Sequence, residues 1–598
     1  MENIILSREA FIQLQDKTEC LHGDCKHLLI LNEKLRHLDN SSFSDEEQKI
    51  LELLTRVSSI LLTDNSKKTF APLLQNVNGG RTCVPEDFTD DELEFIRIIL
   101  PDVANRLLKA FVADILWYRK YKKDVAYPKV VIEIYLSIQF EDDDFFENLN
   151  LWRRGLCLAS QIRDNNSANE FAQKVYKYVT NTVFDNNARF LKLIELLRQF
   201  ELCKNESEQI IEMLVQFGAQ LENNYFLAEQ YYQEASLWAK QIQKDLEKHA
   251  EFQIKRVFAY IQQAEQDNSG ISANVHYEKA LKILRTLSKE QREKYFTSEK
   301  EAELIRKIKE SGQASISEMK ESVFSFDISN EIKYITDNIK GRDKDSALRN
   351  FTLLFGHISF KKLEEDAINF VKASPLSALF PHTVYGKDGR VISKSSGIDF
   401  SEELNAQNKD VWHNMIWQYM IHISITVQTA ILPALQVIRC EHNILLNDIM
   451  QIVQQSNLIP FDRIGIFAKG LMEGFSYDFT TSLHLLAPQI ENMVRQELQN
   501  SGVRTSVITE SGIEEEAGLS TLVEKDEFTK IFGKDLGFEI KALFCDESGP
   551  NLRNNVAHGL LSTQETQNIY SVYCWWFCFK LVYVQFANTV ESRKNHIS

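Results

Sequence analysis

The chain has 598 residues, a formal net charge of -17 and 44% hydrophobic residues. Its length exceeds what a single hydrophobic core supports, which indicates roughly three to five domains or a long helical array. The negative charge excludes a protein that binds nucleic acid over its whole surface, because affinity for phosphate backbones requires clustered Lys and Arg. Contact with a polyanion is therefore expected only at a local site.

Residue composition favours helices over strands. The chain has only 10 prolines and 22 glycines, and it is rich in Leu, Ile, Glu, Lys and Gln. These residues suit helix interiors, whereas Pro and Gly disfavour them. We therefore expect a mainly α protein.

The N-terminus and the cysteines indicate a cytoplasmic protein. Residues 1–8 lack a basic start followed by an apolar run of roughly 7–15 residues, so no secretory signal is evident. Nine cysteines, an odd number without repeated spacing, are typical of free thiols in a reducing compartment.

Two cysteines and two histidines lie close together at Cys20, His22, Cys25 and His27. They are either zinc ligands or ordinary helix residues. Structural zinc sites usually separate their ligand pairs by a longer loop, which favours the second interpretation. We expect neither a metal nor another cofactor.

Residues 1–200 form the first predicted domain, a set of packed helices. Apolar residues recur at helical spacing in Ile50–Leu62 and Val103–Leu116. The acidic run Glu141–Asp144 indicates either a cation site or a solvated helix start, and the helix dipole favours the second.

Residues 201–330 form a second region, rich in charged residues, Ala and Gln. The pattern Tyr-x-x-Ala-x-x-apolar occurs at Tyr232 with Ala235 and again at Tyr277 with Ala280. Small residues at such positions allow close helix packing in hairpin repeats resembling the tetratricopeptide kind, although two copies fall short of the usual three. We predict an α-solenoid-like region that either binds a protein partner or sensed ligand, or serves as a scaffold.

Residues 331–400 form a predicted connecting segment with a short β-hairpin. Thr383–Tyr385 and Arg390–Ile392 flank the turn Gly386–Gly389. The turn lacks the Gly-Lys-Ser/Thr ending of a phosphate-binding loop, so its predicted role is structural.

Residues 401–598 are predicted to form a helical bundle. Its apolar helices are expected at Val411–Gln455 with a kink or break at Pro433, Phe461–Glu473, Asp478–Asn500 and Gln564–Glu591. The run Ile569–Ala587 is long enough to span a membrane. It includes Lys580, which costs about 2.5–3.5 kcal/mol on insertion, so a core helix is the favoured interpretation and membrane association the alternative.

One face of the predicted helix Asp478–Asn500 carries His484, Pro488, Glu491 and Arg495 at 4, 3, 4 spacing. Glu491 and Arg495 form an i,i+4 pair in the favourable orientation. This face either stabilises its helix or lines a cleft opposite the motif described next.

Residues 551–559 read Asn-Leu-Arg-Asn-Asn-Val-Ala-His-Gly and follow the pair Gly549-Pro550. Proline suits a first helical turn, so the motif is expected to open a helix. Asn554 and His558 then share a face, and Arg553 is long enough to reach it. An amide, a guanidinium and an imidazole converging near a helix N-terminus favour a phosphate, and these residues are the candidate active site.

The segment 553–559 resembles the Arg-Asn-x-x-x-His-Gly signature of a C-terminal domain family found in bacteria and eukaryotes, and it also fits the wider Arg-x(4 to 6)-His pattern of the HEPN superfamily. The resemblance implies a metal-independent endoribonuclease in which two HEPN domains pair to form one composite cleft. It implies catalytic roles for Arg553, Asn554 and His558 on RNA, in a homodimer formed through the C-terminal bundle.

The chemistry of these residue types agrees with that implication. The RNA 2′-hydroxyl attacks the adjacent phosphate, and a histidine with a near-neutral pKa accepts or donates the proton. Arg553 stabilises the negatively charged phosphorane, and Asn554 orients the imidazole or the phosphate. The alternative is structural: His558 packs at a helix contact and Arg553 binds a carboxylate.

Residues 501–550 contain 5 Lys or Arg and 11 Asp or Glu. This negative charge disfavours RNA directly before the motif, so either a second subunit supplies the RNA path or the acidic run Glu514–Glu516 covers the site until a signal moves it.

The sequence thus predicts an endoribonuclease effector, regulated by its helical N-terminal region and acting in stress response or anti-phage defence as the resemblance suggests. The alternatives are a non-catalytic HEPN dimerisation or protein-interaction module and a membrane-associated RNA-turnover factor.

Overall fold

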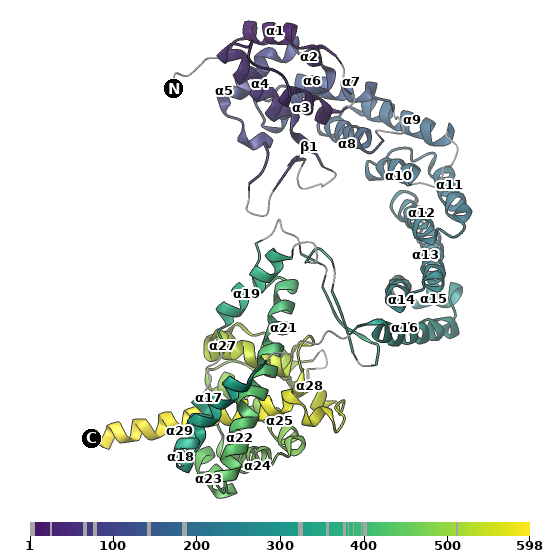
Figure 1. Ribbon diagram of the computed structural model, residues 1–598. Helices are drawn as coiled ribbons and strands as arrows, with labels where there is room; N and C mark the ends of the chain where they lie inside the picture. Colours follow the sequence, from purple (N-terminus) through teal and green to yellow (C-terminus); the bar gives the residue numbers. More distant parts are fainter. Residues whose placement is uncertain are drawn as a thin grey trace. The chain divides into compact units, whose positions relative to one another are not determined.

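The computed structural model describes residues 6–23, 25, 27–63, 69–75, 80–139, 145–181, 188–320, 327–353, 358–374, 378–380, 382–386, 388–395, 397–398, 403–509 and 512–597. The predicted acidic run Glu141–Asp144 lies outside these residues. The fold is mainly α, as predicted, with short two-stranded sheets. The chain divides into an N-terminal unit, Met1–Glu318, and a C-terminal unit, Met319–Ser598 (Figure 1). The predicted segment 201–330 therefore crosses from one unit into the other.

The N-terminal unit begins with packed helices and a small hairpin. Its first elements are α1 Arg8–Lys17, α2 Glu19–His22, α3 Leu28–Arg36, α4 Asp45–Ser58, β1 Ile60–Leu62, β2 Phe70–Pro72, η1 Pro85–Asp87, α5 Asp90–Ile99, η2 Leu100–Asp102, α6 Arg106–Tyr118, α7 Ala126–Ser137, α8 Phe145–Gln161 and α9 Asn165–Asn181. Helix α4 starts at a capping box in which the Ser44 hydroxyl accepts from the Glu47 amide and the Glu47 carboxylate accepts from the Ser44 amide.

The predicted helix Ile50–Leu62 is wrong in its last residues. Helix α4 ends at Ser58, and Ile60–Leu62 form β1, which pairs antiparallel with β2. The three residues are apolar and suit either a helix or a strand, and pairing with a segment distant in sequence decides between them.

The rest of the N-terminal unit is a succession of helices that pack on their neighbours in sequence (Figure 1). They are α10 Arg189–Gln199, α11 Ser207–Gln220, α12 Tyr225–Trp238, the π-helical turn η4 Ala239–Gln243, α13 Leu246–Gln266, α14 Gly270–Leu284, α15 Lys289–Tyr295 and α16 Ser298–Glu318. Ala235 and Ala280, the small residues of the predicted repeat, are fully buried. The predicted helical-repeat-like character of this region is confirmed.

Ion pairs join neighbouring helices of the N-terminal unit. Arg154 of α8 binds Asp114 of α6 with Nη2 2.6 Å from Oδ1, and Arg198 of α10 binds Glu234 of α12 at 2.5 Å. Burial raises the pKa of the Glu234 carboxyl, and the hydrogen bond from Arg198 opposes that shift. Such pairs fix helix register because removing one partner leaves a buried charge uncompensated.

The C-terminal unit is a helical bundle with two hairpins. Its elements are α17 Ser329–Ile339, α18 Lys344–Leu353, α19 Phe360–Ala373, β3 Thr383–Tyr385, β4 Val391–Lys394, α21 Lys409–Thr426, the π-helical turn η5 Val427–Ile431, α22 Leu432–Glu441, α23 Leu446–Gln454, η6 Phe461–Arg463, α24 Ile464–Phe475, α25 Phe479–Asn500, β5 Ser506–Ile508, β6 Glu514–Glu516, α26 Leu519–Leu522, α27 Asp526–Phe544, α28 Leu552–Ala557, η7 Glu565–Gln567 and α29 Ile569–Ile597. The hairpin β3–β4 confirms the prediction for that segment.

The sequence predicts a kink or a break at Pro433, but the helix does not break there. The π-helical turn η5 precedes Pro433, and helix continues through α22 to Glu441. Proline removes one amide donor and crowds the preceding turn, and a π-helical turn accommodates both effects without ending the helix. The chain leaves the helix instead at His442, which is extended.

Helix α29 passes through the core of the C-terminal unit. Its apolar side chains from Val572 to Val582 are buried, and the rings of Trp575 and Phe579 contact Phe475 edge-on and Phe351 at a tilt. Gly474 lets this packing occur, because a Cβ there would overlap the Trp575 ring. The favoured interpretation of 569–587 as a core helix therefore agrees with the burial.

Among the described residues, one helix, Lys409–Glu441, is long and apolar enough to cross a membrane by length and composition. Half of its most apolar window is buried inside the protein, as in a core helix.

Candidate functional site

The motif 551–559 lies on a short helix. Helix α28 spans only Leu552–Ala557, with Leu552 buried at its start. The expectation that Pro550 opens the helix is wrong, because Asn551 adopts a left-handed conformation (φ 49°, ψ 38°) between Pro550 and Leu552. This residue turns the chain after α27 and sets the direction of α28.

Arg553 is held by a carboxylate of another helix. Its Nε forms an ion pair with Oε2 of Glu491 on α25, and its Nη1 donates to Oδ1 of Asn554 at 3.1 Å. The Arg553 side chain is 25% exposed and that of Glu491 11%. The structure therefore brings Arg553 and Asn554 into contact, and it also pairs Arg553 with an acid.

Glu491 is shared between two arginines. Its Oε1 accepts from Nη2 of Arg495 at 2.8 Å, and its Oε2 accepts from the Leu519 amide at 3.3 Å. Arg495 also donates to the carbonyl oxygen of Ala517 at 2.6 Å. The expected i,i+4 pair is thus part of a network that ties α25 to the start of α26 and to α28.

Asn554 is oriented by two acceptors. Its Nδ2 donates to Oδ1 of Asn551 at 2.8 Å and to Oγ of Ser520 at 3.3 Å. These bonds direct its carbonyl oxygen toward Arg553, which donates to it. The amide thereby fixes one side of the guanidinium.

His558 lies at the end of α28 and is exposed. Its backbone amide donates to the carbonyl oxygen of Asn554 at 3.0 Å, and Gly559 follows in a left-handed conformation (φ 63°). Within the described part of the chain, its imidazole has no hydrogen-bond or ion-pair partner. The ring is therefore accessible to a substrate, and one copy of the chain does not bring it into polar contact with Arg553.

The predicted stripe on α25 divides into two parts. Glu491 and Arg495 join the motif, whereas His484 and Pro488 are exposed and His484 Nδ1 bonds the Thr480 carbonyl of its own helix. Pro488 lies inside an uninterrupted helix. In the described residues, the polar contacts between α25 and α28 run through Glu491.

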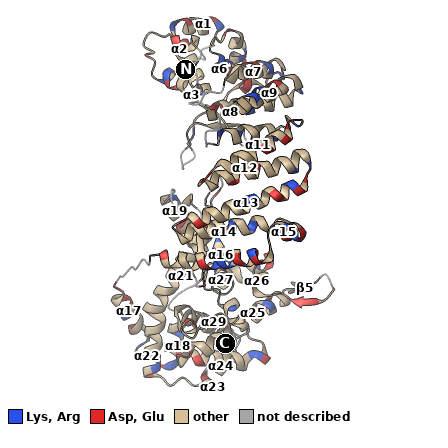
Figure 2. Cartoon of the chain, turned by 90° about the vertical axis from the view of Figure 1, so that its right-hand side faces the viewer, with Lys and Arg blue, Asp and Glu red and all other residues tan. Residues whose placement is uncertain are grey.

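The acidic hairpin β5–β6 extends from the C-terminal unit (Figure 2). Glu516 lies 2.9 Å from Nε of Arg495, whereas Glu514 pairs with Arg504 at 3.0 Å. The hairpin therefore contacts the network behind Arg553 through one of the predicted acidic residues.

A cavity of about 570 Å3 is lined by Ser520, whose Oγ accepts from Asn554 of the motif, and no residue of the motif itself lines it. Its lining also includes Cys545, Lys409, His413 and Lys541, together with the acids Glu524, Asp546 and Glu547. Burial raises the pKa of the Cys545 thiol to about 12 and lowers that of His413. These two groups are therefore neutral near pH 7, and the cavity carries both lysines and carboxylates.

Sequence reasoning missed Lys409, His413 and Lys541. They come from α21 and α27, outside any motif, and Lys541 is paired with Glu524 at 2.6 Å. No local pattern marks residues that meet only in the folded bundle.

Three of the four Cys and His residues considered as zinc ligands contact other residues. His22 lies 3.6 Å from Asp16, His27 pairs with Glu147, and Cys25 Sγ accepts from Nδ2 of Asn105 at 3.4 Å. In the described ranges, no group of at least three His, Cys, Asp or Glu side chains is arranged to hold a metal.

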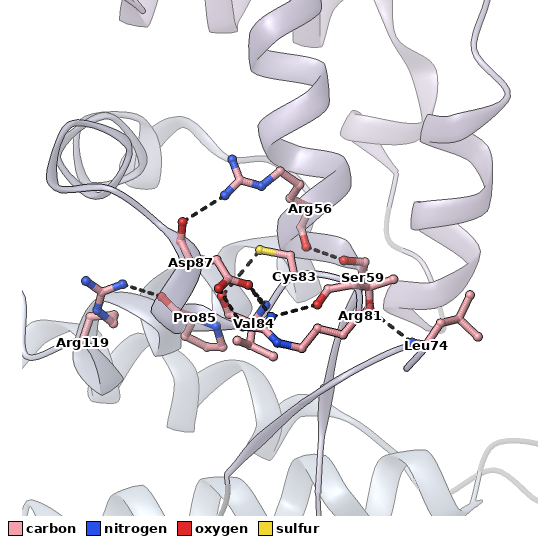
Figure 3. Close-up of polar contacts among 10 residues, drawn as sticks. Arg56, Ser59, Leu74, Arg81, Cys83, Val84, Pro85, Asp87 and Arg119 are labelled. Atoms are coloured by element: carbon pink, nitrogen blue, oxygen red, sulfur yellow. Dashed lines mark hydrogen bonds and ion pairs between the residues drawn. The ribbon is translucent and has the colours of Figure 1, made fainter. Parts of the chain in front are cut away.

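Arginines of the N-terminal unit form a second polar cluster around residues 81–88 (Figure 3). Arg81 binds Asp87 through two hydrogen bonds of 2.5 and 2.8 Å, Arg56 donates to the Asp87 carbonyl, and Arg119 donates to the Pro85 carbonyl at 2.6 Å. These guanidinium groups all bind the loop itself, so the cluster anchors a loop.

Comparison with known proteins places one match on the N-terminal unit. Residues 1–170 match a family described as a domain of unknown function (DUF7380). No curated protein and no solved structure matches the chain.

Proposed function

We propose that the C-terminal unit is a metal-independent endoribonuclease domain of the HEPN type. The observation that carries the proposal is the arrangement of α28, where Arg553 contacts Asn554 and the exposed imidazole of His558 follows one turn later. Accessible imidazole and guanidinium groups are what the internal attack of an RNA 2′-hydroxyl requires.

Each residue has a role that its chemistry supports. His558 transfers protons to and from the RNA, because an imidazole titrates near neutral pH. Arg553 binds the phosphorane oxygens, and the carboxylate of Glu491 now stands where those oxygens would lie. Asn554 positions the guanidinium through its carbonyl oxygen.

Two copies of the chain complete the site in this proposal. In one copy Arg553 is paired with Glu491 and His558 lies apart from it. A homodimer formed through the C-terminal bundle presents two motifs to one RNA. One copy then binds the phosphate, and the other copy transfers the proton. The N-terminal unit regulates the effector by binding a protein partner or a sensed ligand, in the stress or anti-phage role that the motif suggests for a cytoplasmic protein.

RNA cleavage in the presence of EDTA tests the proposal. The parent chain is expected to leave 2′,3′-cyclic phosphate ends, and Arg553→Ala and His558→Ala are each expected to lower the rate at least about 100-fold. Cleavage that stops with EDTA, or that persists in both variants, would refute it.

A second candidate is a non-catalytic interaction module. Its support is the network in which Glu491 binds Arg553, Arg495 and the Leu519 amide, since this network also holds helices together. Sedimentation separates the two candidates. If the domain is an interaction module, the parent chain cleaves no RNA, and Arg553→Ala disrupts its dimers.

A further inference from the structure

The N-terminal unit contains a cavity of about 510 Å3 beside the C-terminal end of α6. This volume lies within the range of about 300–1,000 Å3 typical of small-molecule sites. Its walls include Trp117, Lys120, Lys123, Arg154 and Gln161, and no described lining residue is acidic. In a chain of net charge -17, the charged residues in the described lining of this cavity are all basic.

Arg154 supplies a buried donor to this cavity. The residue is 6% exposed, and its Nε and Nη2 bind Asp114 at 2.9 and 2.6 Å. Among the described residues, its Nη1 has no hydrogen-bond acceptor. Because Asp114 fixes the guanidinium plane, that remaining donor is held in place for an anion.

Lys120 and Lys123 lie in the turn between α6 and α7. Both adopt left-handed backbone conformations, with φ of 54° and 44°. The turn is closed by hydrogen bonds from the Lys120 amide to the Trp117 carbonyl and from the Tyr121 amide to the Leu116 carbonyl, both 2.9 Å. Within the described residues, neither lysine has a carboxylate partner, so their charges are available to a ligand.

Lys122, in the same turn, behaves differently. It is also left-handed, with φ of 51°, but its Nζ pairs with Glu94 at 2.7 Å, and it does not line the cavity. The turn therefore uses one lysine for structure and presents its neighbours to the cavity.

Trp117 gives the cavity a planar aromatic wall. Its Nε1 donates to Oε1 of Gln161 at 2.8 Å, which fixes the indole. Aromatic side chains held in this way bind planar rings by stacking.

We propose that this cavity is a binding site for a free nucleoside phosphate, with the phosphates on Lys120, Lys123 and Arg154 and the base against Trp117. An RNA strand is a poorer fit, because strands are bound in extended basic grooves with successive aromatic residues, whereas these residues form one hollow. The site is separate from the proposed ribonuclease residues, and its occupancy is measured by binding alone.

Isothermal titration of the full chain with each of the four ribonucleoside triphosphates, inorganic pyrophosphate and adenosine tests the proposal. At least one triphosphate is expected to bind at least about tenfold more tightly than pyrophosphate and its nucleoside, because only the nucleotide contacts both the lysines and Trp117. Lys120→Gln and Lys123→Gln are expected to weaken that binding at least about tenfold each. Both residues are exposed, so these variants keep the fold.

Lys122→Gln is the matched control, because it changes the same turn and the same net charge, and its binding should equal that of the parent. Absence of binding by all four triphosphates would overturn the proposal. Equal binding of pyrophosphate would overturn the nucleoside assignment, and unchanged binding in Lys120→Gln and Lys123→Gln would overturn the location.

Discussion

Arg154 of the N-terminal unit and Arg553 of the C-terminal unit both pair with a carboxylate, but in different surroundings. The side chains of Arg154 and Asp114 are 7% and 0% exposed, whereas those of Arg553 and Glu491 are 25% and 11% exposed. Asp114 serves one arginine, while Glu491 is shared with Arg495. The first pair is almost fully buried and holds two helices together, although Arg154 also lines the cavity of the N-terminal unit, whereas the second pair is partly exposed.

The cores of the two units also differ in their use of charged and aromatic side chains. Buried ion pairs join alternate helices of the N-terminal unit, such as Arg198 of α10 with Glu234 of α12. Aromatic rings around Trp575 fill the centre of the C-terminal unit. The centre of the C-terminal unit is therefore held by aromatic packing, while Arg553 and Glu491 pair outside this aromatic cluster.

The largest expected effect is a loss of stability when the buried pair of Asp114 and Arg154 is broken. Asp114→Ala leaves Arg154 charged and buried, and should lower the free energy of unfolding by about 3–5 kcal/mol. Glu491→Gln should lower it by less than about 2 kcal/mol, because Arg553 retains access to water. Urea denaturation of both variants checks this, and equal losses would contradict the contrast between the pairs.

The next largest effect on stability is expected when the aromatic packing of the C-terminal unit is disturbed. Gly474→Ala places a Cβ against the Trp575 ring and should destabilise the protein by about 1–3 kcal/mol. Gly465→Ala, in the same helix α24 but facing open space, should stabilise it by up to about 1 kcal/mol. If both substitutions had the same sign in thermal unfolding, close packing at Gly474 would not be the cause.

The acidic hairpin should have a smaller effect, on activity. Glu516→Gln removes the charge next to Arg495, and under the ribonuclease proposal it should raise basal RNA cleavage about two- to fivefold, the scale of one exposed ion pair. Glu514→Gln, whose partner is Arg504, is the control. Replacing residues 506–516 by a short linker should raise cleavage further, and unchanged cleavage would show that the hairpin does not restrain the site.

The smallest effect concerns the anchored loop of the N-terminal unit. Hydrogen bonds from Arg81 lower the pKa of Asp87 to about 2. A carboxyl with a lowered pKa stabilises the fold above its unfolded pKa of about 4, and this contribution disappears as pH falls through about 2. Arg81→Gln should therefore reduce the difference in melting temperature between pH 5 and pH 2, and an unchanged difference would exclude this ion pair as its source.

Local sequence patterns predicted much of the fold. Helix α25 lies at the predicted residues because Asp478 caps it, its side chain accepting from the Thr481 amide at 2.9 Å. The Glu491–Arg495 contact followed from i,i+4 spacing. The structure of Ile60–Leu62 depends on pairing with a distant strand, and their apolar pattern alone did not distinguish helix from strand.

The sequence named the candidate residues, but it did not predict how they are arranged. The sequence left open, as alternatives, a carboxylate partner for Arg553 and a position of Glu491 opposite the motif, but it did not specify that these two residues pair. Helix α28 ends at Ala557, which places His558 at its C-cap, and the left-handed Gly559 follows directly. The cavity lysines Lys409 and Lys541 meet only through packing of α21 and α27.

Cleavage of RNA in EDTA by His558→Ala tests the central claim most directly. His558 is exposed and its imidazole binds no described residue, so the substitution should leave the fold intact. The proposal predicts a rate at least about 100-fold below that of the parent, whereas His37→Ala, which changes an exposed histidine of the N-terminal unit, should cleave at the parental rate. Parental cleavage by a folded His558→Ala chain would contradict the assignment.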